Sequence, residues 1–325
     1  IFMPMLPETA SALYGCLKTG AIAVPIFSGF GIDAAATRIA DADCDLVICA
    51  DGFYRRGSVI SLLENANKAF EKAGCVDQAF ILNRINSDQS ITSTQSRSWD
   101  DAVANQSRKF ESAVLDSDHP AMLLYSSGTT GKPKGVLHTH ENMTVNAYSH
   151  IIELGITADD TMLLMTPLPH SAGAFLWAGL LAGATVVVRN GFDIDIALST
   201  IENESITWTF MVPTMIYRVL DSPQLSDHDT SSLDTLVYGA APMTPARLRE
   251  GLDAFGPVFL QFYGQTEVPN LITTFGKQEV EDGIEGEWEL VRSWQSFLDF
   301  FEDAVHIDAV TYCESPGLIR DLFRE

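Results

Sequence analysis

The stretch YSSGTTGKPKG, residues 125–135, combines glycines, hydroxyl side chains and two lysines directly after the apolar run PAMLLY. Glycine lets a backbone approach a ligand closely, hydroxyl groups donate hydrogen bonds, and lysine brings positive charge. Together these residue types favour a polyanion, such as a phosphate chain, as the ligand. A flexible linker rich in Ser, Gly and Thr has a similar composition and stays open as the alternative.

The spacing of the glycines excludes a Walker A loop, which needs four residues between its glycines, then Lys and Ser or Thr, and opens a helix. Here two residues separate Gly128 from Gly131, and Pro133 follows Lys132. The segment VLHTH, residues 136–140, alternates and is rich in residues typical of strands, so it predicts a second strand. The loop would then join two strands and hold its anion without a helix dipole.

Two further stretches lie where α/β proteins bind ligands, directly after strand-like runs. In VYGAAP, residues 237–242, small residues leave room for a planar ring against the backbone. In QFYGQTE, residues 261–267, Tyr263 can stack on a base, Thr266 can bond a phosphate and Glu267 can supply an oxygen to Mg²⁺. Either motif alone is also typical of an ordinary strand end that runs into a glycine turn.

The histidines give weaker evidence. His170, in PLPHSAG, begins an apolar helix beside small residues that could border a pocket. His138 and His140 have the spacing that places two side chains on one face of a strand, but no third metal ligand is evident. A structural role is the simpler interpretation of this pair. The Gly-x-Ser-x-Gly motif of serine hydrolases is absent from the sequence.

The composition is that of a globular protein with an acidic surface. Of 325 residues 46% are hydrophobic, and 43 acids outnumber 20 bases, for a formal net charge of -23. This charge argues against nucleic acid or an anionic membrane as a partner. The five cysteines, at positions 16, 44, 49, 75 and 313, form no CxxC pair. We therefore expect reduced thiols and a cytoplasmic location.

Residues 172–188 carry no charged side chain, which is near the threshold for a membrane-spanning helix. Gly173, Gly179 and Gly183 interrupt the run, and TVVVR at 185–189 changes to strand-like residues. We expect a buried helix followed by a buried strand, and no integral membrane segment. The sequence starts within an apolar run, so we expect the true N-terminus and any targeting signal to lie outside it.

Strand-like runs alternate with helical patterns along the chain, which predicts an α/β fold with largely parallel, buried sheets. The expected strands are 21–27, 45–50, 79–83, 185–189, 207–212 and 235–241. The expected helices are 33–43, 57–73, 193–205, 213–221 and 244–255. In the last helix, Thr244 is expected to cap and Pro245 to occupy the first position. Residues 84–118 are polar and are expected to form an irregular, exposed connection.

Taken in order, YSSGTTGKPKG, PLPHSAG, VYGAAP and QFYGQTE resemble the signature series of the adenylate-forming superfamily, which includes acyl-CoA synthetases, luciferases and peptide-synthetase adenylation domains. The resemblance covers residues 1–276. It implies the large N-terminal domain of such an enzyme, with stacked, mostly parallel sheets and flanking helices, and without the small C-terminal lid domain. Some segments are most similar to fatty-acyl-CoA ligases and others to the acetyl- and propionyl-CoA branch, so the acyl length stays open.

The resemblance implies a two-step reaction of ATP, a carboxylic acid and CoA, with Mg²⁺ as cofactor. The carboxylate, expected to be that of a fatty acid, attacks the α-phosphate to give acyl-AMP and pyrophosphate, and the CoA thiol then takes the acyl group. Positioning and neutralisation of phosphate charge are what this chemistry needs, and lysine, hydroxyl donors and a carboxylate-held Mg²⁺ provide both.

The resemblance also implies roles for individual residues. The β- and γ-phosphates would be held by Ser126, Ser127, Gly128, Thr129, Thr130 and Lys134. Adenine would be surrounded by Gly239, Ala240, Ala241, Pro242 and Tyr263, and the other nucleotide-binding candidates are Gly131, Gln261, Phe262 and Gly264. Thr266 would contact the α-phosphate, Glu267 the metal and His170 the acyl group. Lys134, His170, Thr266 and Glu267 are the catalytic candidates.

After Phe275 the pattern of the superfamily stops. Residues 277–325 hold thirteen acids and four bases, and Lys277 is their only lysine. We interpret 277–325 as an acidic tail of unrelated sequence joined to a truncated ligase, with a divergent lid as the alternative. We therefore expect weak nucleotide binding and little acyl-CoA formation. A nucleotide- or acyl-binding protein without catalysis is the competing hypothesis, and a Walker-type NTPase that releases phosphate is a more distant one.

Overall fold

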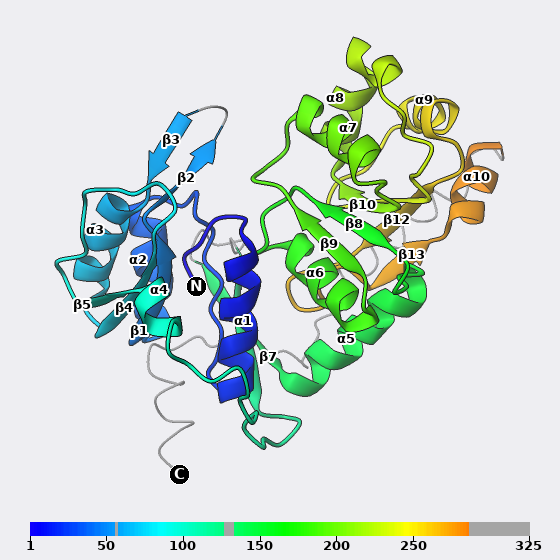
Figure 1. Cartoon of the computed structure of the whole chain (residues 1–325). Coiled ribbons are helices and arrows are strands. Elements are labelled where there is room, and N and C mark those ends of the chain that lie inside the picture. Colours follow the sequence, from blue (N-terminus) through cyan, green and yellow to red (C-terminus); the bar gives the residue numbers. More distant parts are fainter. Residues whose placement is uncertain (56–57, 127–132, 286–325) are drawn as a thin grey trace. The chain divides into compact units, whose positions relative to one another are not determined.

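The computed structural model describes residues 1–55, 58–126 and 133–285, which fall into two compact units (Figure 1). The first unit consists of residues 1–143 and 167–169, and the second of residues 144–166 and 170–285. Helix α5 (His140–Glu153) lies in the second unit except for its first four residues.

The first unit contains a three-stranded parallel sheet in the order β1-β4-β5. Its strands are β1 (Leu46–Ala50), β4 (Gln78–Leu82) and β5 (Gln95–Ser98). The helices of this unit are α1 (Pro7–Thr19), α2 (Ile32–Asp41), α3 (Leu63–Ala73) and α4 (Trp99–Val103). Two antiparallel pairs complete it, β2 (Gly52–Arg55) with β3 (Ser58–Ser61), and β6 (Pro120–Ser126) with β7 (Lys134–Thr139).

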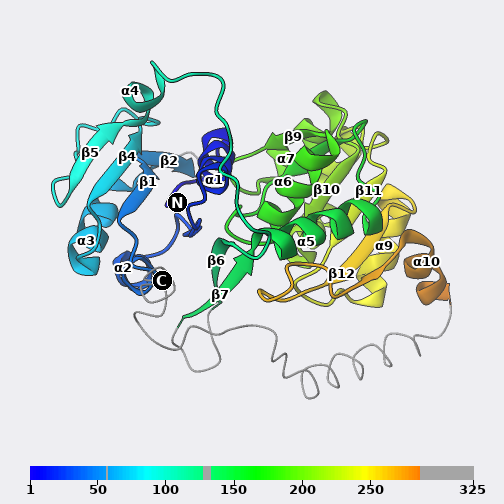
Figure 2. The same cartoon turned by 90° about the horizontal axis from the view of Figure 1, so that it is seen from below.

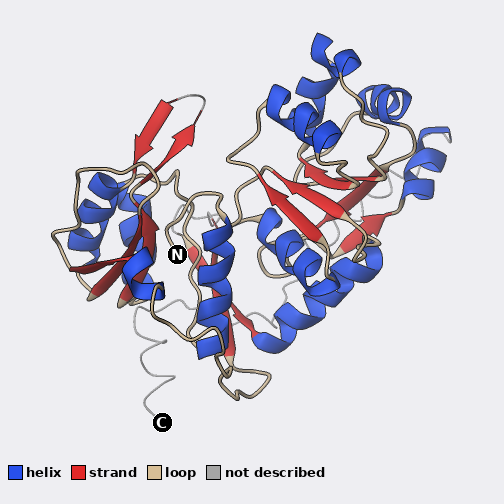
Figure 3. Cartoon of the chain, in the orientation of Figure 1, coloured by secondary structure: helices blue, strands red, loops and turns tan. Residues whose placement is uncertain are grey.

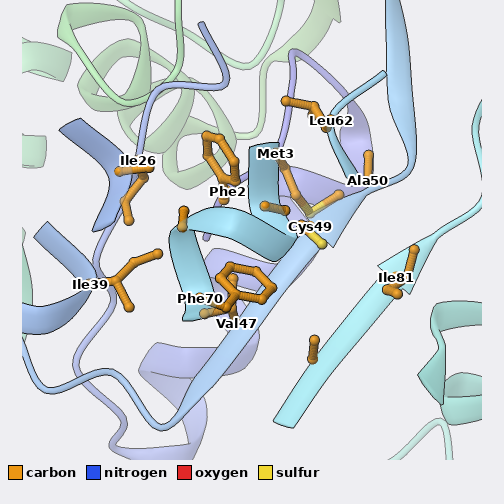
Figure 4. Close-up of a cluster of buried hydrophobic side chains, with 14 of the residues drawn as sticks. Phe2, Met3, Ile26, Ile39, Val47, Cys49, Ala50, Leu62, Phe70 and Ile81 are labelled. Carbon is orange, nitrogen blue, oxygen red and sulfur yellow. The ribbon is translucent and has the colours of Figure 1, made fainter. Parts of the chain in front are cut away.

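The core of the first unit gathers around strand β1 (Figure 4). Val47 and Cys49 alternate along the strand and point to one face, as the two-residue period of a strand requires. Ile39 from α2 and Phe70 from α3 pack into the same cluster. Phe2 pairs with Cys49 through an isolated parallel bridge and is fully buried, so the first residues of the chain complete this core.

The second unit is built on a six-stranded sheet in the order β13-β12-β11-β10-β8-β9, parallel except for the antiparallel strand β13. Its strands are β8 (Thr161–Leu164), β9 (Thr185–Val188), β10 (Trp208–Met211), β11 (Thr235–Tyr238), β12 (Phe259–Tyr263) and β13 (Thr273–Phe275). The remaining helices are α6 (Ser171–Ala182), α7 (Ile194–Asn203), α8 (Pro213–Leu220), α9 (Pro245–Phe255), α10 (Lys277–Glu285) and the 3-10 turn η1 (Pro223–Asp227).

Helices cover both faces of this sheet, with α7, α8 and α9 on one side and α5 and α6 on the other (Figures 1 and 3). Aliphatic side chains such as Ile201 and Ile216 fill the first interface. The second interface is aromatic, because Phe175 of α6 packs on Phe210 at 4.9 Å and on Phe262 at 5.6 Å between ring centroids. The central strands are therefore buried on both faces, and every residue of β10 and β11 is buried.

The expected α/β fold is confirmed, and so are most of the expected elements. Strands overlap the expected ranges 45–50, 79–83, 207–212 and 235–241, and the three predicted helices of the second unit appear as α7, α8 and α9. Pro245 occupies the first position of α9, and Thr244 is its N-cap residue, although its side chain makes no capping hydrogen bond. The four cysteines at 16, 44, 49 and 75 form no disulfide, whereas Cys313 lies outside the described residues.

Three expectations in the first unit are wrong. Residues 21–27 form only one isolated bridge, at Ala23, and Pro25 removes a backbone donor that a strand would use. The expected helix 57–73 begins only at Leu63, because Ser58–Ser61 pairs with β2 instead. The connection 84–118 contains β5 and α4, since even polar residues can form an edge strand when a partner such as β4 is available.

The apolar run 172–188 folds as helix α6 followed by strand β9, as expected. The strand is not buried, however, because β9 lies at the edge of the sheet with only β8 as neighbour. Among the residues that the structure describes, no helix is long and apolar enough to cross a membrane.

Candidate functional site

The stretch YSSGTTGKPKG begins at the end of β6 and ends in β7, and these two strands form an antiparallel pair (Figure 2). The register places Tyr125 opposite Gly135 and Ser126 opposite Lys134, so the two described candidates of this loop face each other at the strand ends. Both are half-buried. Ser127, Gly128, Thr129, Thr130 and Gly131 lie outside the described residues. The prediction that the loop joins two strands is confirmed.

Helix α2 holds the strand that leads into this loop. The Tyr125 hydroxyl donates a hydrogen bond of 2.6 Å to a carboxylate oxygen of Asp41. The buried Arg38 guanidinium lies 5.6 Å from the centre of the Tyr125 ring and 4.3 Å from that of Phe30. Burial, and then the hydrogen bond to Asp41, raises the pKa of the Tyr125 hydroxyl. Tyr125 therefore stays protonated and ties β6 to α2.

Replacing Tyr125 with phenylalanine is expected to lower the free energy of unfolding by about 1.5–3 kcal/mol, because the Asp41 carboxylate loses a donor. Urea denaturation measures the change. Tyr148→Phe is the matched control, since that side chain is 53% exposed on α5 and its replacement should change the free energy little. Equal effects of the two substitutions would contradict the role given to Asp41.

In the second unit, VYGAAP begins at the carboxyl end of β11. Gly239 is buried, and a Cβ atom there would lie 2.7 Å from the carbonyl oxygen and from two ring carbons of Phe262. Only glycine fits this approach between neighbouring strands. Ala240 has a φ of 65° and, like Ala241 and Pro242, is exposed. The motif therefore turns sharply out of the sheet and presents small side chains to solvent.

QFYGQTE begins within the neighbouring strand β12. Gln261 accepts a hydrogen bond of 3.2 Å from the Tyr238 hydroxyl, and the Phe262 side chain is only 4% exposed within the aromatic core. Tyr263 is half-buried, and its hydroxyl oxygen accepts a hydrogen bond of 2.8 Å from the Gln265 amide. The parallel register pairs Tyr238 with Gln261, so the two motifs leave adjacent strands at the same edge.

The chain after β12 forms a tight loop that carries Thr266 and Glu267, both half-buried. The amide of Ile272 donates to the carbonyl of Tyr263 at 2.8 Å, which closes the loop. A Cβ atom on Gly264 would lie 2.4 Å from the Cα and carbonyl carbon of Asn270, so the two ends of the loop touch through their backbones. This close approach leaves no room for a side chain at position 264.

Two residues that the sequence analysis did not single out fix this loop, His150 of α5 and Asn270. His150 is fully buried, and its Nδ1 lies 2.7 Å from the carbonyl oxygen of Asn146. Its Nε2 lies 3.1 Å from the Asn270 side-chain nitrogen, which also donates to the carbonyl oxygen of Ser171 at 3.1 Å. Burial lowers the pKa of His150 to about 4.

The burial of His150 can be predicted from the helical spacing of the residues around it. Met143, Ala147, His150 and Leu154 lie on one face with spacings of three and four residues, and all four are buried. A histidine among apolar positions of one face indicates a buried imidazole that needs hydrogen-bond partners. No local pattern points to Asn270, because its partners lie 120 and 99 residues away along the chain.

The sequence of both units matches one known family. The family described as AMP-binding enzyme matches residues 1–292. The chain belongs to this family. The match extends beyond residue 276, into the segment that was interpreted as an unrelated tail.

The relatives of this chain include synthetases of different acids. It is 44% identical over 151 residues to an acetyl-coenzyme A synthetase of Streptomyces coelicolor. The aligned region covers 46% of this chain and 23% of that protein. It is 37% identical over 182 residues to the medium/long-chain-fatty-acid–CoA ligase FadD8 of Mycobacterium tuberculosis. That aligned region covers 56% of this chain and 32% of the ligase. The aligned parts thus span about a quarter to a third of these relatives.

A solved structure shows the same fold. The amide bond synthetase McbA from Marinactinospora thermotolerans has a TM-score of 0.71 and 23% sequence identity to this chain. The similarity covers 87% of this chain and 53% of McbA. The expected fold of an adenylate-forming N-terminal domain is confirmed by this likeness and by the family match.

The histidines singled out in the sequence occupy different environments in the fold. His170 is exposed at the N-cap position of α6, and its carbonyl oxygen accepts a hydrogen bond of 2.9 Å from Gly173. His138 is buried in β7, and His140 begins α5. The described residues contain no group of three or more His, Cys, Asp or Glu placed to hold a metal ion.

The lowered pKa of His150 predicts a pH-dependent stability. The folded state binds a proton at His150 less well than the unfolded state does. The contribution of neutral His150 to the free energy of unfolding is therefore complete above pH 6.5 and is lost as the pH falls toward about 4. We expect it to remove about 2 kcal/mol between pH 7 and pH 5. Denaturant unfolding at both values measures the loss, and His150→Phe should show a smaller one. If His150→Phe loses as much free energy of unfolding between pH 7 and pH 5 as the unsubstituted chain, folding does not lower the pKa of His150.

Proposed function

We propose that this chain uses ATP to activate a carboxylic acid as its acyl-adenylate and transfers the acyl group to CoA. In the first step a carboxylate oxygen bonds to the α-phosphorus of ATP, and pyrophosphate leaves. In the second, the CoA sulfur bonds to the acyl carbon, AMP leaves, and the thiol proton passes to solvent. The observation that carries the proposal is the family match over residues 1–292, with VYGAAP and QFYGQTE at adjacent strand ends.

The loop 126–134 is proposed to bind the β- and γ-phosphates. Ser126 and Lys134 face each other where the described strands end, and Tyr125 anchors the first strand on Asp41. The candidates Ser127, Gly128, Thr129, Thr130 and Gly131 complete the loop in the sequence. A chain with a net charge of -23 repels a polyanion at long range, so a local lysine is needed to hold it.

The residues 239–242 and Tyr263 are proposed to surround the adenine. Ala240, Ala241 and Pro242 are exposed and small, so a planar base can lie against their backbone. Tyr263 is half-buried and offers its ring for stacking. Three further residues are proposed to shape the adenine site without contacting the base. Gly239 and Gly264 allow close backbone contacts, and the Phe262 ring packs beneath the strand in the core.

Thr266 and Glu267 are proposed to meet the α-phosphate and Mg²⁺. Mg²⁺ keeps several waters and is usually bound through one or two carboxylates together with substrate phosphates. A single half-buried Glu267 on a fixed loop fits this donor set, although the described residues contain no larger metal-binding cluster. When bound, the ion neutralises charge on the phosphate oxygens. Thr266 would donate a hydrogen bond to the phosphate that the carboxylate attacks.

The acid is proposed to be a fatty acid and to lie near His170, which is exposed at the start of α6. The curated relatives include an acetyl-CoA synthetase and a medium/long-chain ligase, so a panel of chain lengths is the appropriate probe. The net charge of -23 favours small-molecule partners over nucleic acid, and the free cysteines fit a cytoplasmic location.

We also propose a domain boundary near residue 276. Helix α10 starts at Lys277, and its Val280 is buried against the core of the second unit. The ammonium group of Lys277 pairs with the carboxylate of Asp234 at 2.7 Å.

The test is pyrophosphate release from Mg·ATP with acetate, butyrate, octanoate or palmitate, with and without CoA. The proposal expects pyrophosphate release that depends on the added acid. Saturable ATP binding without release would support a binding protein that performs no chemistry. Release of phosphate in place of pyrophosphate would indicate an NTPase and contradict the proposal.

A further inference from the structure

We infer that His150 and Asn270 are positioning residues that fix the loop carrying Thr266 and Glu267 for Mg·ATP. The inference rests on the proposed function, because the roles of Thr266 and Glu267 come from it. Neither His150 nor Asn270 is a candidate for contact with substrate. They act through the hydrogen bonds that join α5, the loop after β12 and the first turn of α6.

The partners of the imidazole fix its tautomer. The carbonyl oxygen of Asn146 can only accept, so Nδ1 of His150 carries the proton and donates to it at 2.7 Å. Nε2 then has a free lone pair and accepts from the Asn270 amide at 3.1 Å. The second hydrogen of that amide points to the carbonyl oxygen of Ser171, also at 3.1 Å. Every polar atom of the imidazole and both amide hydrogens are used.

Helix α5 supports the loop at further points. The Asn146 side chain donates to the carbonyl oxygen of Pro269 at 3.0 Å, one residue before Asn270. The His150 ring also packs against Phe175 at 5.5 Å between ring centroids, within the aromatic core. The helix therefore holds two successive residues of the loop, and the core in turn holds the imidazole.

Asn270 fixes one end of the loop that carries the catalytic candidates Thr266 and Glu267. Gly264 touches the backbone of Asn270, so the segment between them is closed at its two ends, and Thr266 and Glu267 lie inside it. Ser171, the other partner of the Asn270 amide, directly follows His170. One side chain thus ties the QTE segment to the start of α6.

The backbone at Asn270 allows the side chain to be tested separately. Its φ of 65° lies in the left-handed region, which Asn and Gly adopt far more readily than other residues. Asn270→Gly keeps this conformation and removes only the hydrogen bonds to His150 and Ser171. Asn86→Gly is the matched control, because Asn86 has a φ of 51° and is exposed.

The first measurement is hydrogen exchange of the full chain without nucleotide. We expect Asn270→Gly to speed exchange of the amides in 264–272 and 171–175 about tenfold and to leave β10 and β11 unchanged. Asn86→Gly should leave all four segments unchanged. His150→Phe, which keeps a ring against Phe175, should give the same local pattern and serves if Asn270→Gly fails to fold. Unchanged exchange in 264–272 would overturn the inference.

The second measurement is the affinity for ATP by calorimetry with and without Mg²⁺. Mg²⁺ is expected to raise the affinity for ATP, and Asn270→Gly should make this increase about tenfold smaller. The affinity for adenosine should stay the same. Faster exchange with an unchanged Mg²⁺ effect would overturn the inference, since the network would then be only structural. Absence of ATP binding in the unsubstituted chain would instead defeat the proposed function, while the exchange result still decides whether Asn270 orders the loop.

Discussion

Replacing Gly264 with alanine is expected to lower the affinity for Mg·ATP at least about tenfold and the free energy of unfolding by about 1–3 kcal/mol. The new Cβ atom would lie 2.4 Å from backbone atoms of Asn270, and neither backbone can move freely. Asn270 is held by His150 and Ser171, and Gly264 directly follows the ordered strand β12. The clash must therefore displace the segment with Thr266 and Glu267. Calorimetry and urea denaturation measure the two effects.

Gly283→Ala is the matched control for this substitution. Gly283 lies in helix α10 of the same unit, and a Cβ atom there would meet nothing within 4 Å. Alanine is the better helix former by about 1 kcal/mol, so this variant should be equally or more stable and bind nucleotide normally. If Gly264→Ala behaves like Gly283→Ala, the close approach of Gly264 and Asn270 is not part of the functional state.

Replacing Lys134 with alanine is expected to weaken ATP binding by about 10- to 100-fold, because a hydrogen bond between a charged lysine and phosphate is worth about 1.5–3 kcal/mol. Lys134 faces Ser126 at the mouth of the loop, where the described strands end. The loss should shrink as salt concentration rises, since salt screens the attraction. Calorimetric titration with ATP at low and high salt measures both the loss and its screening.

Lys132→Ala serves as the comparison for Lys134→Ala, because it removes the same charge two residues earlier in the same loop. Its effect should be smaller, because Lys134 faces Ser126 at the start of β7 and Lys132 is not among the proposed phosphate ligands. A greater loss from Lys132→Ala would show that the register assigned to the loop is wrong. Equal small losses from both would mean that the loop does not bind the phosphates.

The sequence predicts those parts of the fold that depend on local pattern. Buried runs such as 207–212 and 235–241 contain strands because their residues suit a sheet covered on both faces. Pro213 after the first run and Gly239 after β11 mark the strand ends. Strand β7 was predicted from alternation within VLHTH, and Pro245 indicated the start of α9. These features need no information from distant residues.

What the sequence could not predict depends on distant partners. Ser58–Ser61 and Gln95–Ser98 have no pattern that demands a strand, and they become strands because β2 and β4 offer free edges. The hydrogen bond of Tyr125 to Asp41 spans 84 residues, and that of Asn270 to His150 spans 120. Burial of each polar group requires a partner, but only the fold specifies which one.

The most direct test of the proposed chemistry follows the oxygen atoms of the acid. The chain is supplied with Mg·ATP and octanoate labelled with ¹⁸O in both carboxylate oxygens, and hydroxylamine replaces CoA as the acyl acceptor. Attack of the carboxylate on the α-phosphate leaves one labelled oxygen on phosphorus when the acyl group departs. The account predicts octanoyl hydroxamate together with AMP that carries one ¹⁸O, as read by mass spectrometry. AMP without label, or ATP bound and never cleaved, would contradict it.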